Sequence, residues 1–417
     1  MGYHRRRHAT TVVPAWHGPS LRSSRALDWF VFFLADVQTG FGPFIAVYLT
    51  TQKWTQAEIG LVLSVNGFVA LLGQIPGGAL VDWARSERLV AALSVAVIGV
   101  SALAYAAWPI FPVVLAAAIL QAAASCVLGP TIAAISLGLV GRREIGRRLG
   151  RNARFASIGS GLAAAAMGAC GYFLSSRSVF IVTLLLTIPT IVSCALIRAQ
   201  EINPELAHGA DESGNNKSKT TFLTLAKNSV LMKFALVLFM FQFANAAMLP
   251  TLGGLITMQS STSAPAVIAA CMVVPQIVVA LLSPSIGLGA QTWGRRPLLL
   301  VGMGALLLRT LLFAFIRDPN LLVLIQIFDG ISASVFSVLI PLIVVDATYG
   351  SGHFNVAQGI VGTATGIGAS VSVLLAGYVA DHAGGSAAFF ALGIIAAAAF
   401  NLVWFVMPET RSRQAAA

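Results

Sequence analysis

Charge is scarce in this sequence. Of its 417 residues only 10% are Asp, Glu, Lys or Arg, whereas 57% are hydrophobic and the mean hydropathy is +0.84. A typical soluble domain is about one quarter charged. No water-soluble fold of this length could bury so much apolar surface, so a soluble enzyme or binding domain is excluded and a lipid bilayer is the expected partner.

Motifs for enzymatic chemistry are also missing. The sequence contains no G-x-x-x-x-G-K-[ST] phosphate-binding loop, so ATP is not expected to drive its action directly. Its six histidines lie mostly in tails and loops without metal-ligand spacing, and its four cysteines fall singly inside predicted helices. We therefore predict a protein that is not an enzyme and that has no cofactor and no metal site.

Long apolar runs, in contrast, recur along the whole chain. Each is close to or above the ~20 residues that a helix needs to cross a ~30 Å hydrocarbon core. Twelve spanning helices are predicted, an even number that places both termini on one side. Their ranges are 26–49, 57–80, 89–108, 112–139, 152–174 and 178–198 in the first half and 230–257, 265–289, 298–316, 321–346, 357–380 and 386–407 in the second.

The basic residues predict which side that is, because positively charged loops stay in the cytoplasm. Of 26 Lys and Arg, the loops after odd-numbered helices hold only Lys53, Arg177 and Arg317, and Arg309 lies inside a predicted helix. The other 22 lie on the opposite face, so both termini are predicted to be cytoplasmic, in a bacterial-type inner (plasma) membrane. The net charge of +11 is explained by this topology and by anionic headgroups, and nucleic acid is not expected as a partner.

One polar segment, residues 200–228, divides the chain near its midpoint. Similar residues recur on either side of it at an offset of 206 to 209: Pro43 with Pro250, Gly78 with Gly287, Gly171 with Gly377, and Gln121 with Asp329. A fixed offset indicates a duplicated six-helix unit. We predict a basic tail over 1–24, a six-helix bundle over 25–199, a linker over 200–228, a second six-helix bundle over 229–408 and a tail over 409–417.

A motif between the second and third helices of each half carries a family resemblance. The first copy has Gly78, Leu80, Asp82, Arg85 and Arg88, and the second has Gly287, Gln291, Gly294, Arg295 and Arg296. Both resemble the pattern G-x-L-x-D-x-x-G-R-R, and the chain is similar to the major facilitator superfamily over residues 25 to 410. The first copy lacks the Gly-Arg pair, and the second has Gln291 where the pattern has Asp.

This resemblance implies an all-α membrane fold of two six-helix bundles and secondary transport by alternating access. It also implies a cytoplasmic gate at Gly78, Asp82, Arg85, Arg88, Gly294, Arg295 and Arg296, although arginines that merely obey the topology are the alternative. The family's antiporters usually carry a Gly-Pro in the fifth helix. Here that stretch has glycines and no proline, so uptake stays open beside efflux.

Ionisable residues inside the spans are expected to be functional because charge is costly in hydrocarbon. Asp36 lies near mid-depth of the first helix and could bind and release a proton; substrate contact and a helix-to-helix hydrogen bond are the alternatives. Arg309 and Asp329 lie at similar depth and are predicted to form a buried ion pair, which serves either coupling or structure alone. Asp346 and Asp381 lie near helix ends and are expected to face water or to cap helices, and Asp28 is likewise expected near the cytoplasmic surface.

Amide side chains gather near mid-depth and are predicted, with Arg309 and Asp329, to line a substrate cavity: Gln38, Asn66, Gln242, Asn245 and Gln276. Amides donate and accept hydrogen bonds, so they suit a polar but uncharged solute or the polar edge of an amphipathic one. The leading hypothesis is proton-coupled efflux of a small amphipathic or toxic compound by a monomer. Proton-coupled uptake of a metabolite is the alternative, and a membrane sensor without transport is a third.

Overall fold

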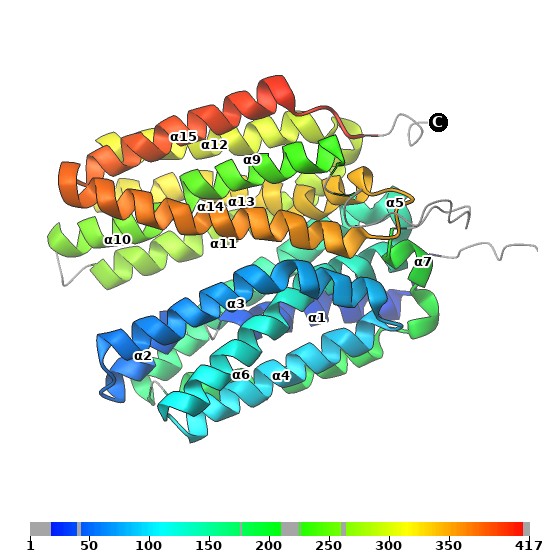
Figure 1. The fold of residues 1–417 in the computed structure, drawn as a ribbon, viewed down its shortest axis with the longest axis horizontal. Helices are drawn as coiled ribbons and strands as arrows, with labels where there is room; N and C mark the ends of the chain where they lie inside the picture. The colour runs from blue at the N-terminus through cyan, green and yellow to red at the C-terminus, as the bar shows by residue number, and fades with distance from the viewer. Residues whose placement is uncertain are drawn as a thin grey trace, which may run out of the picture.

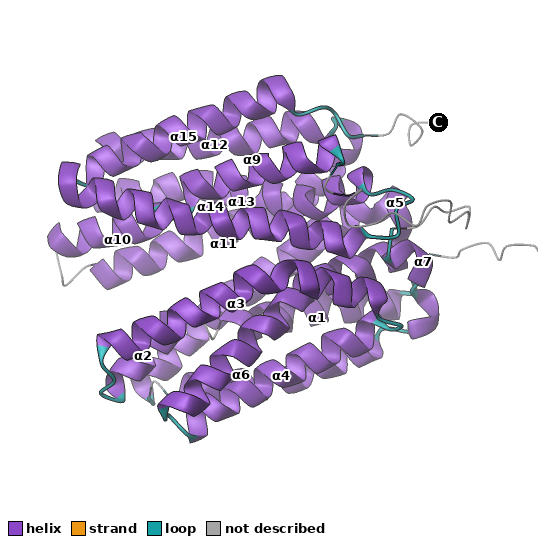
Figure 2. Cartoon of the chain, in the orientation of Figure 1, coloured by secondary structure: helices purple, strands orange, loops and turns teal. Residues whose placement is uncertain are grey.

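The computed structural model describes residues 18–39, 43–175, 177–209, 225, 227–259 and 264–411. Within these ranges the chain is built from helices and has no strand (Figure 2). The first half contains α1 (Leu21–Thr39), α2 (Pro43–Thr51), α3 (Gln56–Trp83), α4 (Glu87–Ala107), α5 (Phe111–Phe173) and α6 (Ser178–Leu196), followed by the short η1 (Ala199–Glu201) and α7 (Pro204–Ala207). The second half contains α9 (Ser229–Asn245), α10 (Met248–Gln259), α11 (Ala264–Thr292), α12 (Arg295–Phe315), α13 (Pro319–Ala347), α14 (Phe354–Ala383) and α15 (Gly385–Val406).

Polar residues at the edges of the apolar runs set where several helices begin. Thr55 precedes α3 and forms a reciprocal capping box with Glu58. The hydroxyl of Ser86 caps α4, the amide oxygen of Asn228 caps α9, and the carboxylate of Asp318 caps α13. Each cap satisfies backbone N–H groups that have no partner within the helix.

The helices account for twelve membrane crossings. Ten helices in the described part of the chain are long and apolar enough to span a bilayer. One of them, α5, has 63 residues and changes direction at Gly141 (φ 65°, ψ −179°), so it provides two crossings. The pair α1 and α2 provides the last. The predicted loop between residues 139 and 152 is therefore wrong, because this arginine-rich segment is helical apart from the bend. Residues 40–42, part of the predicted first helix, and 210–224, part of the predicted linker, lie outside the described residues.

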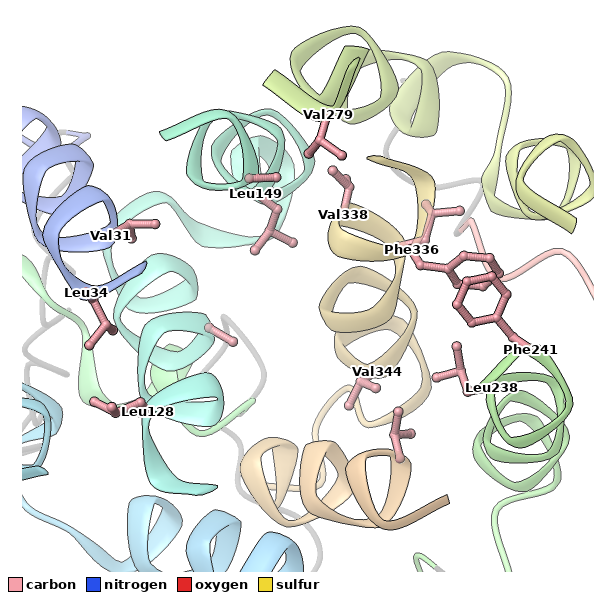
Figure 3. Packing of buried hydrophobic residues seen from close by; sticks show 14 of the residues in the cluster. Val31, Leu34, Leu128, Leu149, Leu238, Phe241, Val279, Phe336, Val338 and Val344 are labelled. Carbon is pink, nitrogen blue, oxygen red and sulfur yellow. The ribbon is translucent and has the colours of Figure 1, made fainter. Parts of the chain in front are cut away.

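Two helical bundles lie side by side (Figure 1). Helices α1 to α6 pack on one another in the first bundle, and α9 to α15 do so in the second. The bundles contact each other mainly through α3 with α14 and α5 with α11. Buried apolar residues of both bundles belong to one continuous cluster. In the first bundle it includes Val31 and Leu34 of α1 and Leu128 of α5, and in the second the ring centroids of Phe241 on α9 and Phe336 on α13 lie 3.9 Å apart (Figure 3).

The bundles meet at one end and separate toward the other (Figure 1). We call the end with α7 and the start of α14 the closed end, where Gly78 and Gly359 bring α3 against the backbone of α14. The opposite end, with α2 and α10, is the open end. There a Cβ on Gly67 of α3 or Gly377 of α14 would have no neighbouring atom within 4 Å.

Candidate functional site

The first polar cluster of the spans lies in the first bundle. Asp36 of α1 is 5% exposed and faces α5 at Gly159, where a Cβ would come within 3.1 Å of its Oδ1 atom. No described residue forms a hydrogen bond with this Oδ1. The absence of a side chain at Gly159 therefore makes room for a carboxyl group, one oxygen of which has no hydrogen-bond partner among the described residues.

Amides of the same bundle form a short chain from α3 to α5. The Nδ2 of Asn66 donates to the Oε1 of Gln121 at 3.4 Å, and the Nε2 of Gln121 donates to the hydroxyl of Ser125 at 3.1 Å. Gln38 is exposed on α1 and takes no part in this chain. The structure thus joins one of the two amides predicted here, Asn66, to a neighbouring polar network.

The second cluster lies in the other bundle and centres on Arg309 of α12. Its guanidinium donates to Asp329 of α13 at 2.6 Å and to the Oδ1 of Asn245 on α9 at 2.7 Å. The Nδ2 of Asn245 in turn lies 3.5 Å from the Oε1 of Gln242. Arg309 is 2% exposed, so this ion pair is buried on the arginine side. The predicted pair forms, and it recruits two of the predicted cavity amides.

Gln276 lies apart from both clusters, where α11 packs against α5. A Cβ on Gly161 of α5 would lie 3.8 Å from the Cβ of Gln276. Its position between the bundles means that any change in their relative tilt would change its surroundings.

At the closed end, the first motif copy contacts the opposite bundle. Asp82 accepts hydrogen bonds from the backbone N–H of Asn355 at 3.2 Å and of Val356 at 2.8 Å, and from the Nδ2 of Asn355 at 2.8 Å. These groups belong to the first turn of α14, whose free N–H groups favour an anion. Arg88 instead donates to the carbonyls of Cys194 and Ala195 in its own bundle, and Arg85 is exposed. Among the described residues, Arg88 therefore bonds within its own bundle and not with the opposite one.

The second motif copy is anchored within its own bundle by two carboxylates. Gly294 has a φ of +101°, and Glu409 accepts the N–H groups of Arg295 and Arg296 at 2.9 and 3.0 Å. The Nε of Arg295 also pairs with Asp346 at 2.9 Å. The positive φ favours glycine at 294 and turns the chain toward Glu409.

Two links from this anchored region reach the first bundle. Asp346 pairs with Arg142 of α5 at 3.4 Å, and the Nε2 of Gln291 donates to the carbonyl of Arg143 at 2.7 Å. The Asp346 side chain is only 7% exposed, so the expectation that it lies near water is wrong. Gln291, which replaces the motif's Asp, bridges the bundles with a neutral side chain.

Asp28 is likewise buried, at the closed end of the first bundle. It pairs with Arg148 at 2.7 Å and with Arg151 at 2.5 Å, and its side chain is 2% exposed. The two arginines lie three residues apart on α5, so they share one helix face toward α1. Sequence reasoning missed this triad because the segment that carries the arginines was expected to be a loop.

The segment after α6 crosses the closed end and joins both bundles. The Nε2 of His208 lies 3.2 Å from Glu87 of α4, while its carbonyl accepts the N–H of Phe354 on α14 at 3.3 Å. The carbonyl of Gly209 accepts the N–H of Gly350 at 2.9 Å. Hydrogen bonding to Glu87 raises the pKa of His208 above its ordinary value, against the opposing effect of burial. This pair could not be predicted from the sequence, because the two residues are far apart along the chain.

Comparisons with known proteins fit this architecture. The family described as Major Facilitator Superfamily matches residues 29–278 and 237–417. Two relatives, from Mycobacterium tuberculosis strains CDC 1551 and H37Rv, are each named an uncharacterized MFS-type transporter; each is 39% identical over 395 residues, which cover 93% of this chain and 94% of the relative.

Solved structures of transporters share the fold. The Escherichia coli fucose:proton symporter FucP matches with a TM-score of 0.73 and 15% identity, over 92% of this chain and 98% of that one. A structure of FucP in the outward conformation gives a TM-score of 0.74 at 16% identity, over 92% and 99%. The human organic anion transporter MFSD10 gives 0.68 at 15% identity, also over 92% and 99%. At these identities the likeness shows the fold alone.

Proposed function

We propose, since the chain belongs to the major facilitator superfamily and is a secondary transporter, that it exports a small amphipathic compound in exchange for protons and that Asp36 carries the proton. We further propose that it works as a monomer in a bacterial-type plasma membrane, with both termini in the cytoplasm. The basic residues gathered at the closed end support this orientation. The structure then represents the state that is open to the outside.

The observation that carries the proposal is the contrast between Asp36 and other buried carboxylates. Asp28 and Asp346 each have two arginine partners, whereas the Oδ1 of Asp36 has no hydrogen-bond partner among the described residues. An ionised carboxylate in such a place costs several kcal/mol, roughly, unless a counter-charge or a proton neutralises it. Protonation of Asp36 would favour this packing of α1 on α5, and release of the proton would favour another.

The substrate class follows from the groups that remain available. Arg309 is already neutralised by Asp329, so the second cluster offers little net charge to an ionic solute. The half-buried amides of Asn66, Gln242 and Gln276 can each donate and accept a hydrogen bond. Such a set suits a compound with a few polar atoms on an apolar body, so we expect the substrate to be an uncharged or weakly charged amphipathic molecule.

A transport assay with a matched acid variant tests the proposal. Cells that express the wild type, Asp36→Asn or Asp381→Asn are compared for accumulation of a panel of amphipathic compounds at several external pH values. Asp381 is an exposed carboxylate on α14, so its variant controls for the loss of one acidic group. We expect cells with the wild type or Asp381→Asn to accumulate less compound, to an extent that depends on external pH. This pH dependence should be absent in Asp36→Asn. Higher accumulation in expressing cells would indicate uptake instead of export, and an unchanged pH dependence in Asp36→Asn would remove the proton role.

A further inference from the structure

A pocket of about 410 Å³ lies on the outside of the first bundle at the closed end. It lies between the first turns of α1 and the last turn of α6, away from both polar clusters and from the contacts between the bundles. Its lining consists of Leu21, Arg22, Arg25, Ala26, Trp29, Ser193 and Leu196. The set combines two cations, one indole and an apolar floor.

Local hydrogen bonds hold the walls of this pocket together. The backbone N–H and the hydroxyl of Ser20 both donate to Glu201 at 2.9 Å, and the hydroxyl of Ser23 accepts the N–H of Arg198 at 3.1 Å. The start of α1 is thereby tied to the residues that follow α6. Glu201 also pairs with Arg198 at 3.4 Å, so its charge is already engaged.

No acidic residue in the described part of the chain pairs with the two arginines of the pocket. Arg22 and Arg25 are exposed, and no described residue forms an ion pair or a hydrogen bond with either guanidinium. Two other arginines at the closed end, Arg148 and Arg151, differ in this respect because both form ion pairs with Asp28. Residues three apart on a helix lie on one face, so both charges are presented to the same pocket. An anion is the ligand that would neutralise them.

The surface next to the pocket indicates what kind of molecule bears that anion. Exposed aliphatic side chains follow one face of α6 from the pocket into the membrane span: Leu196, Val192, Ile188 and Leu185. At 1.5 Å per residue they extend roughly 17 Å, about the depth of one leaflet of a ~30 Å hydrocarbon core. Trp29 stacks on Phe33 with the ring centroids 5.7 Å apart and is half exposed, as is typical of a tryptophan at the membrane interface.

From this arrangement we infer that the pocket binds an anionic phospholipid, with its phosphate on Arg22 and Arg25 and one acyl chain along the exposed face of α6. Guanidinium groups form strong charge-assisted hydrogen bonds with phosphate oxygens. A small soluble anion would use the arginines but leave the aliphatic face uncovered. The site is separate from the transport pathway and does not depend on the proposed substrate or on Asp36.

Native mass spectrometry of the purified full chain tests the inference. Phosphatidylglycerol, phosphatidylcholine or inorganic phosphate is titrated onto the wild type, the double variant Arg22→Gln/Arg25→Gln, and a control double variant Arg85→Gln/Arg143→Gln. The control removes two exposed arginines of the same end that do not line the pocket. Each basic residue near an anionic surface strengthens binding about five- to tenfold. We therefore expect phosphatidylglycerol to bind the variant without both pocket arginines roughly 30-fold more weakly.

The other arms decide between lipid and ion. Wild type and control should retain phosphatidylglycerol in preference to phosphatidylcholine, and phosphate alone should not displace it at equal concentration. The double variant Arg22→Lys/Arg25→Lys should keep most of the binding, because it retains both positive charges. Equal retention by the pocket variant, an equal loss in the control, or displacement by phosphate would each overturn the inference.

Discussion

Replacing Gly78 with alanine should destabilise the closed end. A Cβ at this position would lie 2.7 Å from the carbonyl carbon of Asn355 and 3.1 Å from the Cα of Val356, whereas ordinary contact begins at 3.4 Å. Both neighbours are backbone atoms that cannot rotate away. The carbonyl oxygen of Asn355 lies closer still, so helices α3 and α14 must separate by more than about 0.7 Å at this point to reach ordinary packing distance.

The energetic cost falls on the conformation in which the bundles meet here. Overpacking a rigid contact costs about 1–3 kcal/mol. Separation also stretches the hydrogen bonds that Asp82 accepts from Asn355 and Val356, and bonds to charged groups are worth about 1.5–3 kcal/mol each. The better helix propensity of alanine, about 1 kcal/mol, is present in every conformation and cancels. A net shift of about 2–3 kcal/mol would change the ratio of closed to separated ends roughly 30- to 150-fold.

Distances between spin labels across the closed end measure this shift. Labels replace Arg85 and Lys227, which are exposed on different bundles, in a background without the native cysteines. Gly289→Ala is the matched control, because a Cβ on Gly289 of α11 would meet only side-chain carbons at 3.7 to 3.9 Å. The longer distance should gain population in Gly78→Ala and not in Gly289→Ala. Identical distance distributions in all three proteins would refute the reasoning from close packing.

Two further predictions concern the charged pairs. Glu87 raises the pKa of His208, so the charged pair is present below that pKa and is lost as pH rises through it. In an Asp36→Asn background, the distance between the labels at positions 85 and 227 should therefore lengthen as pH rises above about 6.5. The additional substitution His208→Gln should abolish this dependence. A dependence that survives in His208→Gln would exclude the pair as its cause. Asp329→Ala leaves the buried charge of Arg309 uncompensated, so the free energy of thermal unfolding should fall by about 3–5 kcal/mol. The charge swap Arg309→Asp/Asp329→Arg should partly restore it. A single variant as stable as the wild type would contradict that account.

The positions of the helices could be predicted because hydrocarbon thickness fixes the length of an apolar run. The fixed offset of the repeats likewise predicted two similar halves, which is the arrangement of the superfamily. The segment around Gly141 could not be predicted, since a run of arginines between apolar segments is typical of a loop. It is helical because its arginines find buried acceptors on other elements, and Asp28 and Asp346 are two of them.

Contacts in the site could be predicted where two residues lie at the same depth of the membrane on consecutive helices. Arg309 and Asp329 lie at similar distances from the short connection between α12 and α13, so their pairing could be inferred from counting residues. The contact of Asp346 with Arg142 could not be inferred in this way, because Arg142 belongs to the other bundle and only the tertiary fold brings it close. Whether Gln38, Asn66, Gln242, Asn245 and Gln276 bind a substrate, and whether the glycines and arginines of the motif act as a gate, stay predictions.

The most direct test of the account measures proton movement through Asp36. Purified protein in liposomes is given a transported compound on one side, and the internal pH is followed with a trapped dye. The wild type should move protons with the compound, whereas Asp36→Asn, which mimics the neutral carboxyl, should exchange labelled for unlabelled compound without moving protons. Proton movement by Asp36→Asn at the wild-type rate would contradict the assignment of this residue as the proton carrier.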